Sequence, residues 1–532
     1  MAVQISHYDS TYRMRGPENS SNVRNVDSRL EPRRSSAHKA LALPSYPMSA
    51  AAEEKVAQLM TETTPDIAQT GSPPQYRLYR QRFLGLAGFV VLNIVSGWPR
   101  PWFGSIANQA STELGYNLDR INWLGNIMTC TCMPVVLAIP ALATRFGLRK
   151  SCFIGAGSMV TASWIRYAGT SHSLSSNQSY ALVISGQLFS AISQPIFLVL
   201  APKYSETWFD LRGRTAATMV IAVANPVGGA IAQLISSRFA SVRQSILGLA
   251  IVSTAIAPFV LLIYDAPPTP PTYSGSTKSP SLPVLLYALL GKDTAVESHM
   301  KPRERIDFAV LLLVFGTLVA TSNAFALLSG QIMVPQGYSD HTAGLMGATL
   351  LLCGIAAAVV TAPLFDRVFT SHLAPTMKAL VPIVAAGWFS LIWAVRPHNT
   401  AALFVIMTVI GAASLTLLPV ALELGCEVTR NAQGSSALLW FTVNLFEIIF
   451  VQVQGALRAG PNASPPLNMH RALIFNGAFV LATSASVFAL RGKQVRKELD
   501  EQMHRQSQQT EVPLRPLSST NMNPEDSEKV LA

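Results

Sequence analysis

Residues 400–422, TAALFVIMTVIGAASLTLLPVAL, run on without a charged side chain. A helix of about 20 apolar residues spans the roughly 30 Å hydrocarbon core of a bilayer. A helix is the expected form because a chain inside the hydrocarbon must satisfy its own backbone hydrogen bonds. This stretch therefore predicts a transmembrane helix.

Apolar stretches of similar length recur between Phe83 and Leu490. The predicted spans are 83–108, 119–144, 151–170, 178–201, 214–237, 244–264, 307–333, 342–365, 374–395, 400–424, 433–457 and 470–491. The composition agrees, because 13% of the 532 residues are charged, against about 25% in a soluble domain. We predict an all-α membrane protein with twelve transmembrane helices.

The longest internal connection lies between the sixth and seventh predicted spans and opens with the proline-rich stretch 267–271. It divides the spans six and six, as in membrane proteins built from two repeated halves. The predicted parts are a disordered tail at 1–78, an N-terminal six-helix half at 79–265, a central loop at 266–306, a C-terminal six-helix half at 307–491 and a disordered tail at 492–532.

Lysine and arginine are concentrated in the connections that follow even-numbered spans, as at Arg145, Arg149 and Lys150. Cytoplasmic loops carry an excess of these residues, so we predict that these connections, the central loop and both tails are cytoplasmic. The predicted location is the plasma membrane or an internal organelle membrane. The net charge of +11 contains no dense basic block, so nucleic acid is not an expected partner.

Motifs for catalysis or cofactor binding are missing from the sequence. The five cysteines are scattered, and no Cys/His cluster suggests a metal site. The phosphate-binding pattern GxxxxGK[ST] is absent as well. We therefore predict a protein that is not an enzyme and that needs no cofactor or metal.

Several short motifs in the spans resemble one known family. The motifs are Asn93 with Trp98–Trp102, Ile121-Asn122-Trp123-Leu124, Trp164-Ile165-Arg166, Gly186-Gln187, Ser193-Gln194, Asn225-Pro226-Val227-Gly228 and Leu418-Pro419 with Glu423 and Glu427. Over residues 77–491, their order and spacing resemble the feline leukaemia virus subgroup C receptor-related branch of the major facilitator superfamily. The resemblance implies the major-facilitator fold and transport of amines such as choline or ethanolamine. Haem export has also been proposed for that family.

The resemblance also implies where a substrate binds. The counterparts of the family's binding residues are Gln194 in span 4, Asn444 at a glutamine position in span 11, and either Trp98 or Trp102 in span 1. Two positions of the family's cation-binding cage differ. Thr129 stands at a methionine position and Asn323 at a tyrosine position, so both are polar here.

Polar side chains inside the spans are candidate substrate contacts, because such groups are costly in hydrocarbon and tend to face the bundle interior. The amides are Gln194, Asn323, Gln331 and Asn444. The segment Trp98-Pro99-Arg100-Pro101-Trp102 has two readings. It is either a kink lining the pore or an interfacial anchor whose arginine reaches outward.

Glu447 is a carboxylate near the middle of a predicted span, one turn after Asn444. It is a candidate counter-ion for a cationic substrate or a protonatable coupling group. A structural ion pair is the alternative. A proton is thus a partner that the sequence leaves open.

Glu423 and Glu427 are spaced i, i+4 at the cytoplasmic end of span 10. Pairs with Arg149, Arg214 or Arg367 would close an inner gate in one conformation and break in another. The alternative is a solvated helix end.

These observations favour a secondary transporter that moves a small polar amine, such as choline or ethanolamine, by alternating access. The expected partners are this small-molecule substrate and the lipid bilayer. A haem or other amphipathic-molecule transporter, and a membrane receptor or sensor without transport, are the alternatives.

Overall fold

The computed structural model of the chain describes residues 76–511, with gaps at 237, 277–279, 293–298 and 368–371. Within these residues, eleven helices are long and apolar enough to cross a membrane. The predicted all-helical membrane fold is confirmed. Large apolar side chains such as Val359, Val360 and Val405 are more than half exposed, as expected for a surface that faces lipid.

The 52-residue helix α5 (Leu118–Gly169) supplies two of the twelve spans because it reverses direction at Gly147. The φ of Gly147 is 84°, a left-handed value that glycine adopts without strain. Contacts show the reversal. Gln187 donates to the backbone oxygen of Leu124, near the start of α5, and accepts from Arg166, near its end. The two ends of α5 therefore lie at the same level of the bundle.

The N-terminal half holds the first six spans. Its helices are α2 (Gln81–Ser96), α3 (Pro99–Ser105), α4 (Ala107–Leu114), α5, α6 (Ser176–Val199), α7 (Ala201–Trp208), α8 (Arg214–Ser236) and α9 (Val242–Ile256), which continues as a 3-10 helix at Ala257–Leu262. Phe89, Phe197 and Trp102 are among its buried apolar side chains.

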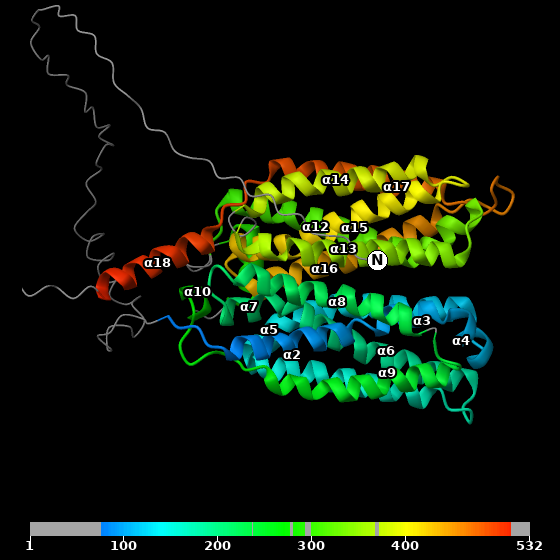
Figure 1. Cartoon of the computed structure of the whole chain (residues 1–532), viewed down its shortest axis with the longest axis horizontal. Helices are drawn as coiled ribbons and strands as arrows, with labels where there is room; N and C mark the ends of the chain where they lie inside the picture. The colour runs from blue at the N-terminus through cyan, green and yellow to red at the C-terminus, as the bar shows by residue number, and fades with distance from the viewer. Residues whose placement is uncertain (1–75, 237, 277–279, 293–298, 368–371, 512–532) are drawn as a thin grey trace, which may run out of the picture. The chain divides into compact units, whose positions relative to one another are not determined.

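The C-terminal half holds the other six spans. Its helices are α12 (Pro302–Met333) with a 3-10 turn at Val334–Gln336, α13 (Asp340–Arg367), α14 (Leu373–Ala394), α15 (Thr400–Thr429), α16 (Ala432–Ala456) and α17 (His470–Ala485) with a 3-10 turn at Ser486–Ala489. Phe308, Trp388 and Met407 lie in its apolar core. The halves meet where α16 packs on α5 and where α13 and α15 pack on α8, and Figure 1 shows them as two adjacent bundles.

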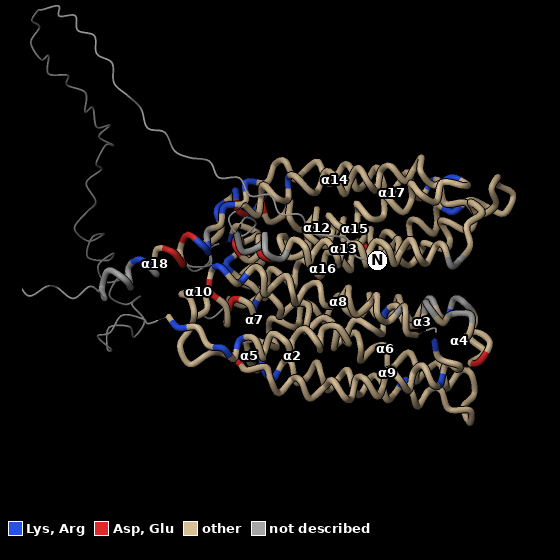
Figure 2. The backbone as a smooth tube through the Cα atoms, viewed as in Figure 1, with Lys and Arg blue, Asp and Glu red and all other residues tan. Residues whose placement is uncertain are grey.

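Two regions hold helices where the sequence suggests a loop or a tail. The connection between the halves contains α10 (Tyr273–Ser276) and α11 (Leu282–Leu290), and α11 buries Leu282 and Leu285 in the core of the C-terminal half. After the last span, the chain forms α18 (Val495–Glu511). Figure 1 shows α18 and α10 at the same end of the bundle. Lys, Arg, Asp and Glu gather at that end in Figure 2.

Candidate functional site

Glu447, on α16, lies at a point where the two halves meet inside the bundle. Its Oε1 atom accepts a hydrogen bond from Arg100 Nη2 at 3.0 Å and another from Thr129 Oγ1 at 3.3 Å. Its Oε2 atom accepts from Asn323 Nδ2 at 2.8 Å. Only 9% of the Glu447 side chain is exposed. Both carboxylate oxygens thus have donors, which is what a buried charge requires.

Arg100 lies in the first span, just after a short interruption between two helical segments. Helix α2 ends at Ser96, and α3 begins at Pro99, a first-turn position where the missing N–H of proline costs no hydrogen bond. Gly97 allows the close approach at this break, because a Cβ atom there would lie 2.8 Å from the backbone oxygen of Asn225. The second residue of α3 is therefore Arg100, whose guanidinium also donates to Thr129 Oγ1 at 2.6 Å.

The Arg100–Glu447 ion pair joins the two halves. Arg100 and Thr129 belong to the N-terminal half, whereas Asn323 and Glu447 belong to the C-terminal half. Thr129 and Asn323 are the two positions at which the sequence differs from the family's cation cage. Both contact the carboxylate of Glu447.

The other three candidate amides have partners elsewhere, and one of them, Gln331, accepts a hydrogen bond from Arg458 Nη2. Gln194 Nε2 donates to Asn225 Oδ1 at 3.0 Å, and Asn225 Nδ2 donates to the backbone oxygen of Asn93 at 3.2 Å. This chain of amides links α6, α8 and α2 within the N-terminal half. Asn444 Nδ2 donates to the backbone oxygen of Trp440, on its own helix, at 2.7 Å. The structure brings Asn323 to Glu447 but uses Gln194 and Asn444 in separate contacts.

The two candidate tryptophans have different surroundings. Trp98 and Trp102 are both buried and stack with their ring centroids 5.7 Å apart. Trp102 Nε1 donates to Ser245 Oγ of α9 at 3.0 Å. Trp98 Nε1 is buried and has no hydrogen-bond partner among the residues described. Trp102 is therefore held in the core of the N-terminal half, and the N–H of Trp98 is the one left for a ligand or a water.

Glu423 and Glu427, one turn apart on α15, lie at the end of the bundle that carries α18. Both form ion pairs with Arg496 of α18, and the distance to Glu427 Oε1 is 2.9 Å. Arg496 Nη1 also pairs with Glu206 Oε1 of α7 at 3.1 Å. Because Glu206 belongs to the N-terminal half and the other two glutamates to the C-terminal half, Arg496 ties the halves together.

A second tie lies beside the first. Arg214 Nη2 of α8 pairs with Asp500 Oδ2 of α18 at 3.3 Å, and both side chains are buried. Asp500 also accepts from the backbone N–H and the hydroxyl of Ser274, each at 2.8 Å. A hollow of about 10 Å³ remains between Arg214 and the two glutamates, which is room for about one water. Because buried side chains of both halves and of α18 pair here, we refer to this end below as the closed end of the bundle.

These ion pairs differ from those expected for the two glutamates. The expected partners are Arg149, Arg214 and Arg367. Among the residues that the structure describes, the carboxylates pair with Arg496 instead. Arg214 pairs with Asp500. The backbone N–H of Arg149 donates to Asp265 Oδ1 at 2.7 Å, and the side chain of Arg367 lies outside the described residues.

Sequence reasoning missed three residues of this closed end, namely Glu206, Arg496 and Asp500. Arg496 and Asp500 are spaced i, i+4 shortly after the last apolar stretch, so a helix places them on one face. That spacing is the available signal. The tail was expected to be disordered because it is polar, but partners on both halves hold this helix in place.

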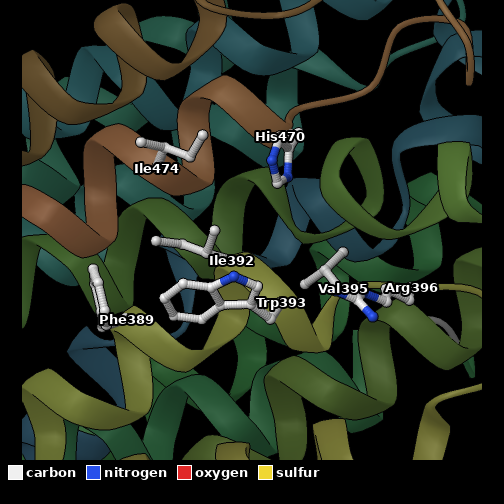
Figure 3. Close-up of a pocket in the computed structure, with 7 residues that line it drawn as sticks. All are labelled: Phe389, Ile392, Trp393, Val395, Arg396, His470 and Ile474. Carbon is white, nitrogen blue, oxygen red and sulfur yellow. The ribbon is translucent and has the colours of Figure 1, made fainter.

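A separate hollow of about 530 Å³ lies between the ends of α14 and α17. Figure 3 shows Ile392 and Trp393 on one side of it, with Ile474 and His470 across from them. All of its lining residues come from the C-terminal half. It contains none of the site residues predicted from the sequence.

Comparison with known proteins supports one family. Residues 86–450 match the family model of the Major Facilitator Superfamily. Solute carrier family 49 member A3 of Danio rerio is 25% identical over 74% of this chain and 81% of its own length. The choline/ethanolamine transporter FLVCR1 of Felis catus is 23% identical over 79% of this chain and 76% of its own length. The crystal structure of the E. coli fucose:proton symporter FucP has the same fold, with a TM-score of 0.56 at 11% identity over 77% of this chain and 99% of that one.

Proposed function

Because the chain belongs to the Major Facilitator Superfamily, we propose that it carries a small polar amine across a membrane by alternating access. The family and the structural likeness make it a multi-pass membrane transporter. The amine class is supported by two features together. One is the name of the FLVCR1 relative, which specifies choline and ethanolamine. The other is the carboxylate at the centre of this bundle.

Glu447 is the observation that carries the proposal. A carboxylate within a span is costly, and such residues mark substrate pathways. Donors from both halves converge on Glu447, so an ammonium group bound at this carboxylate would lie between the halves. We assign Glu447 as the counter-ion and the amide of Asn323 as a second contact. The aromatic face of Trp98 is a third, because tryptophan attracts cations.

The ion pairs of Arg496 and Arg214 with their partners at the α18 end are proposed as the gate. For a transporter of two rocking halves, contacts at one end must break when the site opens there. Arg496 pairs with carboxylates of both halves, so separation of the halves at this end requires Arg496 to release the carboxylates of at least one half. Arg214 holds α18 to the N-terminal half. We place this end, with both chain termini, in the cytoplasm, because basic residues gather there (Figure 2).

Uptake into vesicles tests the proposal. Purified protein in vesicles should take up radiolabelled choline or ethanolamine in a saturable manner. Glu447→Gln should reduce uptake at least tenfold, because the counter-ion is lost. Glu498→Gln, which removes an exposed carboxylate of α18, should leave uptake unchanged. The double variant Arg100→Gln/Glu447→Gln buries no unpaired charge, so it separates loss of function from loss of folding.

Two results would contradict this assignment. The first is no saturable uptake of choline, ethanolamine or their carboxylate-bearing analogues by protein that melts cooperatively, which would favour a receptor or a different solute. The second is uptake by Glu447→Gln equal to that of Glu498→Gln, which would make Glu447 a structural residue.

A further inference from the structure

Each half contributes one charge to the ion pair at the centre of the bundle. Glu447 is 9% exposed, whereas 28% of the Arg100 side chain is exposed while it is paired. Arg100 uses a single nitrogen, Nη2, for its contacts with Thr129 and Glu447. A guanidinium offers five N–H donors in a planar fork. Its other donors have no partner among the described residues and can bind a second oxyanion.

A solute with only a positive charge fits this arrangement poorly. Its ammonium group would share the Glu447 carboxylate with Arg100, which already lies 3.0 Å from it, and like charges at one site repel. If Arg100 moved away instead, its charge would lose its partner in a region poor in water. Either outcome weakens binding of a simple cation.

We propose that the transported solute is a zwitterion, an amine that also carries a carboxylate, and that Arg100 is the residue that binds its anionic group. This inference rests on the proposed transport function. The solute carboxylate binds the guanidinium of Arg100, a group that favours bidentate contact with carboxylates. The hydroxyl of Thr129 lies beside this guanidinium. The cationic nitrogen takes Glu447 and the amide oxygen of Asn323.

In the protein without solute, Arg100 and Glu447 pair with each other in place of the two charged groups of the solute. On binding, one pair is exchanged for two, and no charge is left without a partner at either stage. Because Arg100 belongs to one half and Glu447 to the other, the solute contacts both halves. A ligand with contacts to both moving parts can bias the equilibrium between two conformations.

Matched probes that differ in the anionic group test this inference. Choline is compared with glycine betaine, and ethanolamine with glycine, as competitors and as radiolabelled substrates in vesicles. We expect at least one zwitterion to bind tenfold or more tightly than its matched cation. If choline or ethanolamine is transported but neither zwitterion competes, the zwitterion inference is overturned and the proposed amine transport stands. If none of the four compounds binds, both fail.

Substitutions at Arg100 and Glu447 test which residue binds which charged group of the solute. Arg100→Gln should reduce zwitterion affinity at least tenfold and should narrow or reverse the preference over the matched cation. The exchanged pair Arg100→Glu/Glu447→Arg keeps both charges and should retain more zwitterion binding than either single change. Arg471→Gln, which removes an exposed arginine outside the site, is the control. If Arg100→Gln keeps the zwitterion preference while its melting temperature falls, Arg100 is only structural and the inference is wrong.

Discussion

The guanidinium of Arg496 on α18 donates two hydrogen bonds to one carboxylate oxygen of Glu427 on α15, at 3.0 and 2.9 Å. The same guanidinium pairs with Glu423 and with Glu206. Burial of Arg496 favours its neutral form, but the carboxylates of Glu427 and Glu423 outweigh burial and raise its pKa well above its usual range. Arg496 therefore stays charged, and the tie between the halves does not depend on its titration.

Replacement of Arg496 should open the end of the bundle that carries α18. In Arg496→Gln, three buried carboxylates lose their shared cation and repel one another. Cys426, which is fully buried near these groups, reports the opening. In a variant that keeps Cys426 as its only cysteine, we expect its rate of labelling by a small thiol reagent to rise at least tenfold.

Lys493→Gln is the matched control for this labelling experiment, because it removes an exposed charge two residues before α18 begins. Its labelling rate should equal that of the parent. Equal labelling of Arg496→Gln and Lys493→Gln would show that Arg496 does not hold this end closed.

Gly228 and its neighbour Gly229 should respond oppositely to alanine. A Cβ atom on Gly228 would overlap the backbone oxygen of Ile94, which cannot move aside as a side chain can, whereas nothing lies within 4 Å of a Cβ on Gly229. We expect Gly228→Ala to lower the free energy of unfolding by about 1–3 kcal/mol. Gly229→Ala should be neutral or stabilising by about 0.5–1 kcal/mol. Thermal unfolding in detergent gives the order, and a reversed order would refute the close contact of α2 and α8.

Gln194 should matter for stability. Gln194→Ala removes the donor to Asn225 Oδ1 in the amide chain of the N-terminal half. Because Asn225 is only partly buried, its unpaired acceptor should cost about 1 kcal/mol, the low end of the range for a buried group. A lowered melting temperature is therefore expected. If uptake falls while the melting temperature stays unchanged, Gln194 acts on the solute and the amide chain contributes little to folding.

The two stacked tryptophans can be separated by phenylalanine substitutions. Trp102→Phe removes a buried hydrogen bond to Ser245 and should cost about 0.5–1.5 kcal/mol of stability. Trp98→Phe removes an N–H that has no partner among the described residues, so it should cost less stability than Trp102→Phe while solute affinity falls. Thermal melts and competition binding on both variants check this. If Trp102→Phe lowered solute affinity and Trp98→Phe did not, Trp102 would be the residue that contacts the solute.

The spans could be predicted from composition, because the bilayer thickness sets the length of each apolar stretch. The predicted boundary between the halves also followed from local sequence, since the proline-rich stretch 267–271 interrupts the apolar pattern. Glu447 and Arg100 could be singled out one at a time, because charges inside spans are costly. Their pairing could not be predicted, because the two residues are 347 positions apart and meet through the packing of two separate halves.

The closed end of the bundle shows the same limit. Glu423 and Glu427 can be identified from their spacing. Their partner Arg496 lies on a polar helix, which has no apolar face that would predict packing against the bundle. Such a helix is held by long-range ion pairs with Glu206 and the two glutamates, and the i, i+4 spacing of Arg496 and Asp500 does not reveal these partners. The predicted partners Arg149 and Arg214 were basic residues in nearby connections, and charge alone did not distinguish them.

The central claim is alternating-access transport through a site built on Glu447. Counterflow in vesicles tests it most directly. Vesicles containing purified protein and loaded with unlabelled solute are diluted into a trace of the same solute in radiolabelled form. We predict that the label accumulates transiently above its equilibrium level, that Glu447→Gln abolishes this overshoot and that Glu498→Gln preserves it. The absence of an overshoot with folded parent protein, or an equal overshoot with Glu447→Gln, would contradict the claim.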